Sequence, residues 1–327
     1  MDYVKFGHTG MDVSRLCLGA MGFGDPNNWI HKWILNEEKS RPVIKKALDL
    51  GINFFDTANI YSMGESERVL GKVLNEYANR DDIVVATKVF MPMRPERPNS
   101  GGLSRKEILT EIDHSLERLG MDYVDLFIIH RWDYHTPIEE TMEALHDVVK
   151  AGKARHIGAS AMFTWQFQKA QYTAKENGWT PFVSMQNHYN MIYREEEREM
   201  MPYCSDQQIA VTPYSPLAAG RLTRNSSEST HRSETDQTQK SKYDPMEKVD
   251  RGIIERVGEI ANQHGVSRDK VALAWLLNKN PVVAPIIGAQ KEKHLESAVG
   301  ALDVTLTSQD MHYLEELYVP HPVVGAR

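Results

Sequence analysis

The sequence has 327 residues, of which 25% are charged and 41% are hydrophobic. This is the composition of a globular protein with enough apolar residues for a large core, and it excludes collagen-like, mucin-like and wholly disordered chains. Acidic residues outnumber basic ones by 45 to 38, which gives a net charge of -7. Because no basic domain or stripe occurs, we expect no nucleic acid as a partner.

Membrane segments, secretion signals and disulfides are not predicted. No apolar run approaches the roughly 18 residues that a membrane helix needs, and the first residues lack the pattern of a secretory signal. The two cysteines, Cys17 and Cys204, are too few for a disulfide framework and do not have the spacing of a zinc site. We therefore expect a cytoplasmic protein with reduced thiols, no membrane partner and no bound metal.

Eight short β-rich runs alternate with segments of helical periodicity along the chain. They span residues 14–19, 53–58, 83–89, 124–130, 155–160, 182–188, 210–215 and 284–289. In one intervening segment, Ser104 is expected to cap a helix and Gly120 to end it. Such alternation predicts a parallel sheet with helical crossovers, and eight units favour a closed barrel over an open doubly wound sheet. The predicted fold class is therefore α/β, as one (β/α)8 TIM barrel domain over residues 1–327.

Three segments lie outside this repeating pattern. Residues 3–12 read as a β-hairpin that closes the bottom of the barrel, and an extra helical segment is expected at the C-terminus. Residues 223–242 contain nine Ser or Thr and no aliphatic side chain, so a mobile loop is expected at about 221–250, on the catalytic face. A lid that closes over a ligand and an inert insertion are both compatible with this composition.

Polar residues follow consecutive strand runs at the end of the barrel where active sites lie. Asp56 and Lys88 lie near the ends of the second and third runs, His130 ends the fourth, and the loop after Asp56 carries Tyr61. Any one of them alone could be a turn or capping residue. Together they suit acid catalysis: the ammonium of Lys88 would lower the pKa of a neighbouring phenol, and Asp56 would hold that ammonium. His130 would hydrogen-bond a carbonyl oxygen, so we expect a site that reduces aldehydes or ketones with hydride from a cofactor.

Longer motifs connect the chain to a known family. In order, they read GINFFDTANIYSMGESERVLG, VVATKV, MDYVDLFIIHRWD, PIEETMEALHDVVKAGKARHIGAS, FVSMQNHYN, VTPYSPLAAGRL and PIIGA. With these motifs the chain resembles the aldo-keto reductase superfamily, closest to its aryl-alcohol-dehydrogenase-like (YajO-like) branch. The resemblance implies a catalytic tetrad of Asp56, Tyr61, Lys88 and His130. It also implies a monomeric or weakly associating barrel that binds NADP(H) without a Rossmann module.

The resemblance also implies where the cofactor lies. Tyr214 would stack beneath the nicotinamide, with Ser160 and Gln186 on its carboxamide. Many relatives have Asn after this Ser, whereas this chain has Ala161, so that contact is not carried over. The pyrophosphate would lie against Ser215, Leu217, Gly220 and Arg221.

The adenosine end of the cofactor is expected in the segment that follows the eighth strand. The residues implied there are Gly288, Gln290 and Lys291, ahead of a helix N-terminus suited to phosphate. Lys291 is the candidate partner of the 2′-phosphate. Because a lysine lacks the bidentate fork of the arginine that relatives often have, we expect NADPH to be preferred and NADH to remain possible.

A substrate pocket is expected where aromatic residues follow the first four strands. These residues are Phe23, Trp29, Trp33, Phe90 and Trp132. Aromatic loops favour flat, apolar carbonyl compounds, although each ring could equally pack against the barrel rim.

Two other functions stay open at this point. The superfamily resemblance also covers cofactor-binding subunits that sense redox state and turn over slowly if at all. A barrel enzyme of another type, such as a lyase or isomerase, could use Lys88 as a Schiff-base nucleophile. The predicted function remains NADPH-dependent reduction of a small-molecule carbonyl compound.

Overall fold

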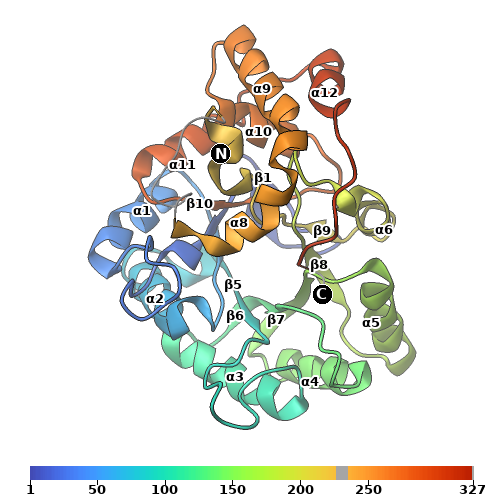
Figure 1. Cartoon of the computed structure of the whole chain (residues 1–327). Helices are drawn as coiled ribbons and strands as arrows, with labels where there is room; N and C mark the ends of the chain where they lie inside the picture. The colour runs from blue at the N-terminus through green and yellow to red at the C-terminus, as the bar shows by residue number, and fades with distance from the viewer. Residues whose placement is uncertain (226–234, 326–327) are drawn as a thin grey trace.

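The structure is a computed structural model that describes residues 1–225 and 235–325. A ring of helices surrounds a central parallel sheet, as Figure 1 shows. Eight strands form this sheet in the order β10-β3-β4-β5-β6-β7-β8-β9. Their bounds are β3 (Cys17–Gly19), β4 (Phe54–Asp56), β5 (Val84–Val89), β6 (Val124–Ile129), β7 (Ala154–Ser160), β8 (Phe182–Gln186), β9 (Ala210–Val211) and β10 (Ile286–Gly288). Each lies within or overlaps a run expected from the sequence.

The helices described outside the sheet follow the strands in alternation. They are α1 (Glu37–Asp49), α2 (Glu65–Tyr77), α3 (Arg105–Leu119), α4 (Ile138–Lys150), α5 (Thr164–Asn177), α6 (Met200–Asp206), α8 (Gln237–Tyr243), α9 (Glu247–His264), α10 (Arg268–Leu277), α11 (Glu292–Val299) and α12 (Ser308–Glu315). Helix α3 has the expected caps. Ser104 accepts a hydrogen bond from the Glu107 amide, and Gly120 ends the helix with φ of 62°. None of the described helices is both long and apolar enough to cross a membrane.

Backbone hydrogen bonds close the sheet into a barrel between its first and last strands. The amide of Val283 donates to the carbonyl of Val211 at 2.9 Å, and the amide of Ile286 donates to Pro213 at 2.9 Å. On the other side, β10 pairs in parallel with β3. The closed (β/α)8 barrel expected from the sequence is therefore confirmed.

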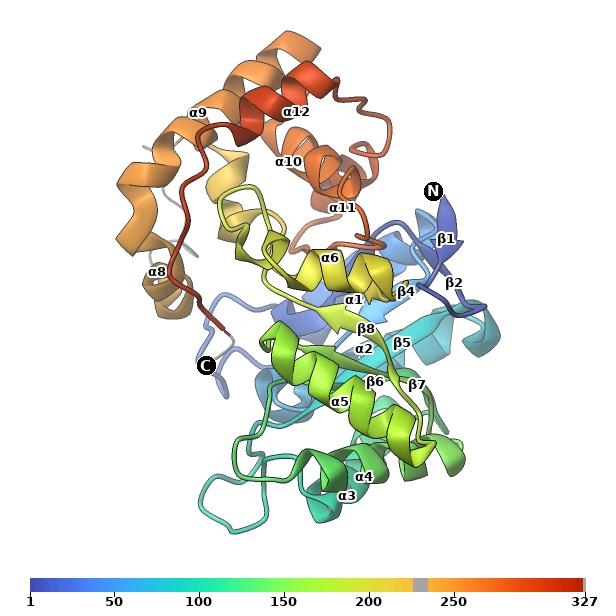
Figure 2. The ribbon, with the colours of Figure 1, turned by 90° about the vertical axis from the view of Figure 1, so that its right-hand side faces the viewer.

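A β-hairpin closes the N-terminal end of the barrel, as expected. Its strands β1 (Tyr3–Lys5) and β2 (Asp12–Ser14) pair antiparallel, at the opposite end from α8 (Figure 2). Phe6 is fully buried and packs edge-on against Phe54 inside the barrel, with ring centroids 5.6 Å apart. Gly7 allows this docking, because a Cβ there would lie 2.7 Å from the carbonyl oxygen of Gln208.

Most of the described residues in the segment expected to be a loop, 221–250, are helical. Residues 226–234 lie outside the described residues, but α8 and the start of α9 cover most of 237–250. Asp236, Gln239 and Tyr243 are buried. The prediction of a loop is wrong for residues 237–250, because a single buried tyrosine and two buried polar side chains give this polar segment an inward face.

The C-terminal segment adds α12 and an extended tail to the barrel. The tail runs past α8 toward the C-terminal end of the strands (Figure 2). His321 holds it through a hydrogen bond of 2.9 Å between Nε2 and Asp250 Oδ1. A Cβ on Gly325 would lie 2.8 Å from the Tyr214 hydroxyl, so the tail borders the barrel mouth.

Substitution of Gly7 tests the docking of the hairpin. Gly7→Ala should lower the free energy of unfolding by about 3 kcal/mol or more, since left-handed backbone costs alanine roughly 1–2 kcal/mol and the added methyl clashes with buried backbone. Gly152→Ala is the matched control, because Gly152 has φ of 75° and nothing within 4 Å of its Cβ position. Urea unfolding followed by circular dichroism would measure both, and equal losses would contradict the close approach.

Candidate active site

Three polar residues lie together at the C-terminal ends of neighbouring strands. Asp56 is the last residue of β4, Lys88 lies near the end of β5, and His130 directly follows β6. Tyr61 begins a short 3-10 helix, Tyr61–Gly64, in the loop after β4. Parallel pairing of β4 with β5 and of β5 with β6 places the strand ends at one face. The structure therefore brings these four residues to one end of the barrel.

The side chain of Lys88 is the centre of this group. It is fully buried, and its ammonium donates to Asp56 Oδ1 at 2.5 Å, to the Thr57 carbonyl at 2.8 Å and to the Tyr61 hydroxyl at 3.2 Å. Burial lowers the pKa of Lys88, but Asp56 and Tyr61 together outweigh burial and the pKa is raised. Lys88 is therefore a charged, fully hydrogen-bonded ammonium at neutral pH.

The Tyr61 phenol remains protonated at neutral pH. Burial raises its pKa, and the Lys88 ammonium opposes this rise without overcoming it. The expectation that Lys88 lowers the pKa of Tyr61 below its usual value is therefore wrong for this structure, because desolvation is the larger effect. Since the ammonium donates to the phenolic oxygen, the hydroxyl proton is free to point toward a ligand.

His130 lies beside Tyr61 as a neutral imidazole. The two rings meet edge to face, with centroids 5.7 Å apart. Burial, followed by the charges of Lys88 and Arg131, holds the pKa of His130 well below its usual value. Its Nδ1 is buried without a hydrogen-bond partner in the described parts of the chain. A neutral imidazole can donate a hydrogen bond to a carbonyl oxygen without carrying charge.

Gln186 and Ser160 extend the site across the barrel. The amide of Gln186 donates to Asp56 Oδ2 at 2.9 Å, which couples β8 to the Asp56 carboxylate. Ser160 has a buried hydroxyl with no partner among the described residues. Ala161 has φ of 47° and donates its amide to the Gln186 carbonyl at 3.0 Å. The Ser160 hydroxyl can therefore bond a ligand, whereas the Gln186 amide already has a partner.

Tyr214 belongs to a stack of aromatic rings. His188 lies parallel to it at 5.3 Å, and Tyr193 lies parallel to His188 at 4.2 Å. The Tyr243 hydroxyl bonds to His188 Nε2 at 2.7 Å. The Tyr214 hydroxyl is buried without a partner among the residues described. A rigid ring with an unpaired hydroxyl suits a flat ligand such as nicotinamide.

Sequence reasoning missed His188, Tyr193 and Tyr243. His188 lies in the polar run NHYN at residues 187–190, directly after a strand end, which was a usable signal; Tyr193 lies three residues beyond this run. Tyr243 lies in the serine-rich segment, where no periodic pattern marks it.

Two of the residues expected at the pyrophosphate, Ser215 and Gly220, lie in a turn with left-handed backbone geometry. Ser215, Ala218, Ala219 and Gly220 have φ of 55°, 47°, 55° and 91°. Left-handed residues also occur in anion-binding nests, but here the amides of Ala218 and Gly220 donate to the carbonyls of Ser215 at 3.0 Å and Leu217 at 2.8 Å. Leu217 lies within this turn and is partly buried.

Arg221, at the end of the same turn, has partners within the chain. It pairs with Asp244 at 2.5 Å and lies over the Tyr243 ring at 4.9 Å. Its charge is therefore partly neutralised by α8 and the residues that follow it.

The residues expected at the adenosine end lie in the loop between β10 and α11. Gly288 ends β10 and has open space around its Cβ position. Gln290 donates to the Trp33 carbonyl at 2.5 Å, so it joins this loop to the loop after β3. Lys291 is exposed at the N-cap position of α11, where charge and helix amides together suit a phosphate.

The expected pocket aromatics occupy different environments. Trp29 lies 6.1 Å from the Tyr61 ring and so borders the catalytic group. Trp33 packs on His31 at 5.3 Å, and Trp132 packs on Trp165 at 6.1 Å. Phe90 is partly buried against the core. Phe23 is fully buried in the core, which is a packing role.

A buried ionic network supports the loop after β4, residues 57–64, from outside the barrel. Arg118 donates to Glu67 Oε2 at 2.5 Å and to Glu111 Oε2 at 3.4 Å. Glu67 also accepts from Thr87 Oγ1 at 2.5 Å, and Glu111 accepts from Asn59 Nδ2 at 2.9 Å. Thr87 precedes Lys88, and Asn59 lies between Asp56 and Tyr61. This network therefore fixes both parts of the chain that carry the lysine and the tyrosine.

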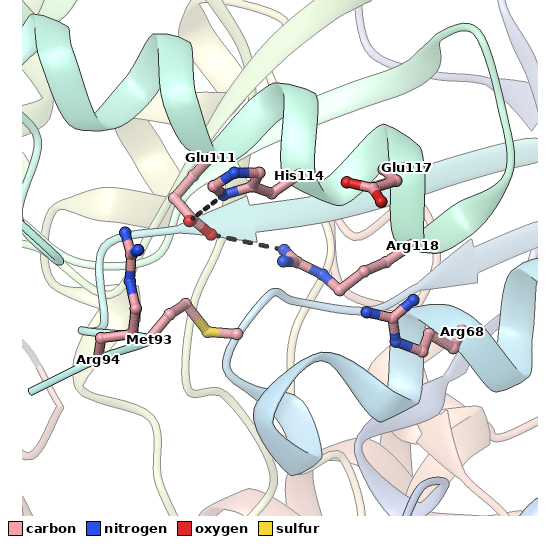
Figure 3. A pocket seen from close by; sticks show the side chains of 7 residues that line it. All are labelled: Arg68, Met93, Arg94, Glu111, His114, Glu117 and Arg118. Carbon is pink, nitrogen blue, oxygen red and sulfur yellow. Dashed lines mark hydrogen bonds and ion pairs between the residues drawn. The ribbon is translucent and has the colours of Figure 1, made fainter.

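The same network forms part of a surface pocket (Figure 3). The pocket is lined by Arg68, Met93, Arg94, Glu111, His114, Glu117 and Arg118. Figure 3 shows Glu111 of α3 between His114 and Arg118, in contact with both.

Comparison with known proteins gives a consistent result. A model of the Aldo/keto reductase family matches residues 15–319. Versiconal hemiacetal acetate reductase of Aspergillus parasiticus is 44% identical over 99% of this chain and 98% of its own length. Aldo-keto reductase dtxS3 of Metarhizium robertsii is 43% identical over 99% of this chain and 93% of its own. A Saccharomyces cerevisiae protein named as a candidate aryl-alcohol dehydrogenase, AAD16, is 38% identical over 97% of both chains.

Removal of the Arg118 guanidinium should loosen the loop after β4. Arg118→Met leaves Glu67 and Glu111 buried without their cation, a change that typically costs about 3–5 kcal/mol when a buried pair is broken. We expect faster amide hydrogen exchange over residues 57–64. Mass spectrometry of deuterated peptides would detect it.

Arg68→Met is the control for this experiment. Arg68 lines the same pocket, but it is more than half exposed, and its ion pair among the described residues is with Glu65. Unchanged exchange over 57–64 in Arg118→Met, or an equal rise in both variants, would show that the network does not hold the loop.

Proposed function

Because the chain belongs to the aldo/keto reductase family and is thus an oxidoreductase, we propose that it reduces aldehydes and ketones to alcohols with NADPH, and that Tyr61 donates the proton. The observation that carries this proposal is the Lys88 ammonium, buried between Asp56 and Tyr61. The reduced nicotinamide, when bound, supplies the hydride.

In this mechanism the protein supplies the proton and stabilises the charges that proton transfer creates. The Tyr61 hydroxyl gives its proton to the carbonyl oxygen of the substrate, and Lys88 stabilises the phenolate that remains. Neutral His130 orients the carbonyl oxygen by a hydrogen bond. Asp56 keeps Lys88 charged and in place, and Gln186 in turn holds Asp56.

The same structure offers groups that suit the cofactor. The unpaired hydroxyls of Ser160 and Tyr214 and the flat Tyr214 ring would hold the nicotinamide. The left-handed turn at 215–220 and Arg221 would face the pyrophosphate. Lys291 would face the 2′-phosphate and so favour NADPH over NADH.

Use of Lys88 as a Schiff-base nucleophile fits the geometry less well. A nucleophilic lysine has to lose its proton, whereas Asp56 and Tyr61 raise the pKa of Lys88. Its three hydrogen bonds also occupy all three of its donors. The site therefore favours proton transfer by Tyr61.

Tyr61→Phe tests the proposed proton donor. Loss of one hydroxyl should lower kcat for 4-nitrobenzaldehyde by about 100-fold or more, which is the usual contribution of a general acid. The decrease in NADPH absorbance measures turnover, and quenching of protein fluorescence should show unchanged NADPH affinity. Full activity in Tyr61→Phe would exclude Tyr61 as the donor. A wild type that binds NADPH without turnover would instead support a regulatory subunit.

Lys291→Glu tests the preference for NADPH. Reversal of charge at the N-cap of α11 should weaken NADPH binding by about 10-fold or more and leave NADH binding little changed. Lys293→Glu, two residues along α11, is the matched control. Fluorescence titration with both cofactors measures the effect. Equal losses in the two variants, or none in Lys291→Glu, would refute the assignment.

A further inference from the structure

Two further cations, Arg131 and Lys242, lie near His130. Arg131 directly follows His130, and its Nη1 donates to the His130 carbonyl at 2.8 Å. Lys242 lies on α8, and its ammonium is 5.1 Å from the centroid of the Tyr214 ring. Arg131 is close enough to act on the charges of Tyr61, His130 and Lys242.

Neither cation has a carboxylate partner in the chain as described. No ion pair or hydrogen bond joins Arg131 or Lys242 to an acidic side chain within residues 1–225 and 235–325. The nearby carboxylates have other partners. Asp133 accepts from the amides of Leu103 and His135.

Two further carboxylates near these cations also have partners among the described residues. Asp236 caps α8 through the Gln239 amide and lies 4.0 Å from His31. Asp56 is bound to Lys88. The two cations therefore repel each other, and the charge of Asp236 offsets only part of this repulsion at Lys242.

Burial of two neighbouring cations is unfavourable, and the pKa of Lys242 reflects it. Burial, then the charge of Arg131, lowers the pKa of Lys242 to about 8. Most Lys242 side chains are still charged at neutral pH. Two partly desolvated cations without an ion-pair partner among the described residues lose solvation that only an anionic ligand would restore.

The backbone that carries Lys242 is anchored at the mouth. Tyr243, its neighbour, is buried and bonded to His188 and to Asn190 Nδ2 at 3.0 Å. No ammonium fits between parallel rings 5.3 Å apart, so Lys242 covers the face of Tyr214 opposite His188. A ligand ring that stacks on this face of Tyr214 displaces the flexible Lys242 side chain. Helix α8 still keeps the Lys242 ammonium beside Tyr214.

We propose that Arg131 and Lys242 form a recognition site for an anionic group of the substrate, so that the preferred carbonyl compounds carry a carboxylate. This inference rests on the proposed reductase function and names its substrate class. The cofactor's phosphates are the other source of such an anion. The substrate is favoured because Arg131 adjoins His130, whereas the expected phosphate residues are the turn at 215–221 and Lys291.

Two aldehydes of nearly the same shape test the proposal. 4-Carboxybenzaldehyde carries a negative charge where 4-nitrobenzaldehyde is neutral, and methyl 4-formylbenzoate is a second neutral reference. For each enzyme, the ratio of kcat/KM for the carboxylate to kcat/KM for the nitro compound is measured. Comparison of this ratio between enzymes removes the difference in intrinsic reactivity.

Variants of Arg131 and Lys242 test whether their charges determine this ratio. Arg131→Gln and Lys242→Met should each lower the ratio by about 10- to 100-fold, which corresponds to one charge-assisted hydrogen bond. Arg131→Lys should retain part of the preference. Lys248→Met removes the same charge from the exposed surface of α9, and its ratio should equal that of the wild type.

Each remaining outcome has a defined meaning. If the ratio in Arg131→Gln and Lys242→Met equals that of the wild type, the proposal is wrong although the reductase function stands. If these variants weaken NADPH binding in fluorescence titration and leave the ratio unchanged, the cations serve the cofactor's phosphates and the proposal is overturned. If the wild type reduces none of the three aldehydes, the proposed function itself fails.

Discussion

The burial of one charged lysine constrains the whole catalytic end of this protein. An ammonium removed from water is stable only when every proton finds an acceptor and a negative charge lies close. For Lys88 all three acceptors come from β4 and its loop: the Asp56 carboxylate, the Thr57 carbonyl and the Tyr61 hydroxyl. The pairing of β4 with β5 and the path of the loop must therefore both be correct. The conditions that keep Lys88 charged also bring the phenol into contact with it.

Two further sets of contacts hold this arrangement from opposite sides. From across the barrel, Gln186 on β8 donates to the second oxygen of Asp56. From outside the barrel, Glu67, Glu111 and Arg118 on α2 and α3 bind the residues next to the lysine and the tyrosine. Parts of the chain that are distant in sequence therefore fix the positions of the same three side chains, Asp56, Lys88 and Tyr61.

The sequence predicts the parts of this structure that depend on local pattern. Strand runs end in polar residues because the barrel interior is apolar and its mouth is not, so Asp56, Lys88 and His130 stand out from the residues before them. The hairpin was predictable from its turn.

The parts that depend on distant contacts were not predictable in the same way. Helix α8 has a polar composition, and only the packing of Tyr243 against His188 explains why it docks. The pKa of Tyr61 also depends on burial by the complete barrel, which no neighbouring residue in the sequence reveals. Phe23 was expected in the substrate pocket but is buried in the core. The sequence pattern of an aromatic residue after a strand does not distinguish these two positions.

The charge at the mouth differs in sign from that of the whole chain. The protein carries a net charge of -7, yet Lys88, Arg131 and Lys242 lie near the Tyr61 phenol and the neutral His130 imidazole. Hydride addition to a carbonyl places negative charge on oxygen, and fixed cations in a poorly solvated site stabilise that charge without reorganisation. Asp56 offsets only the charge of Lys88. The positive potential that remains at the mouth therefore favours both a developing oxyanion and a substrate that arrives with an anion of its own.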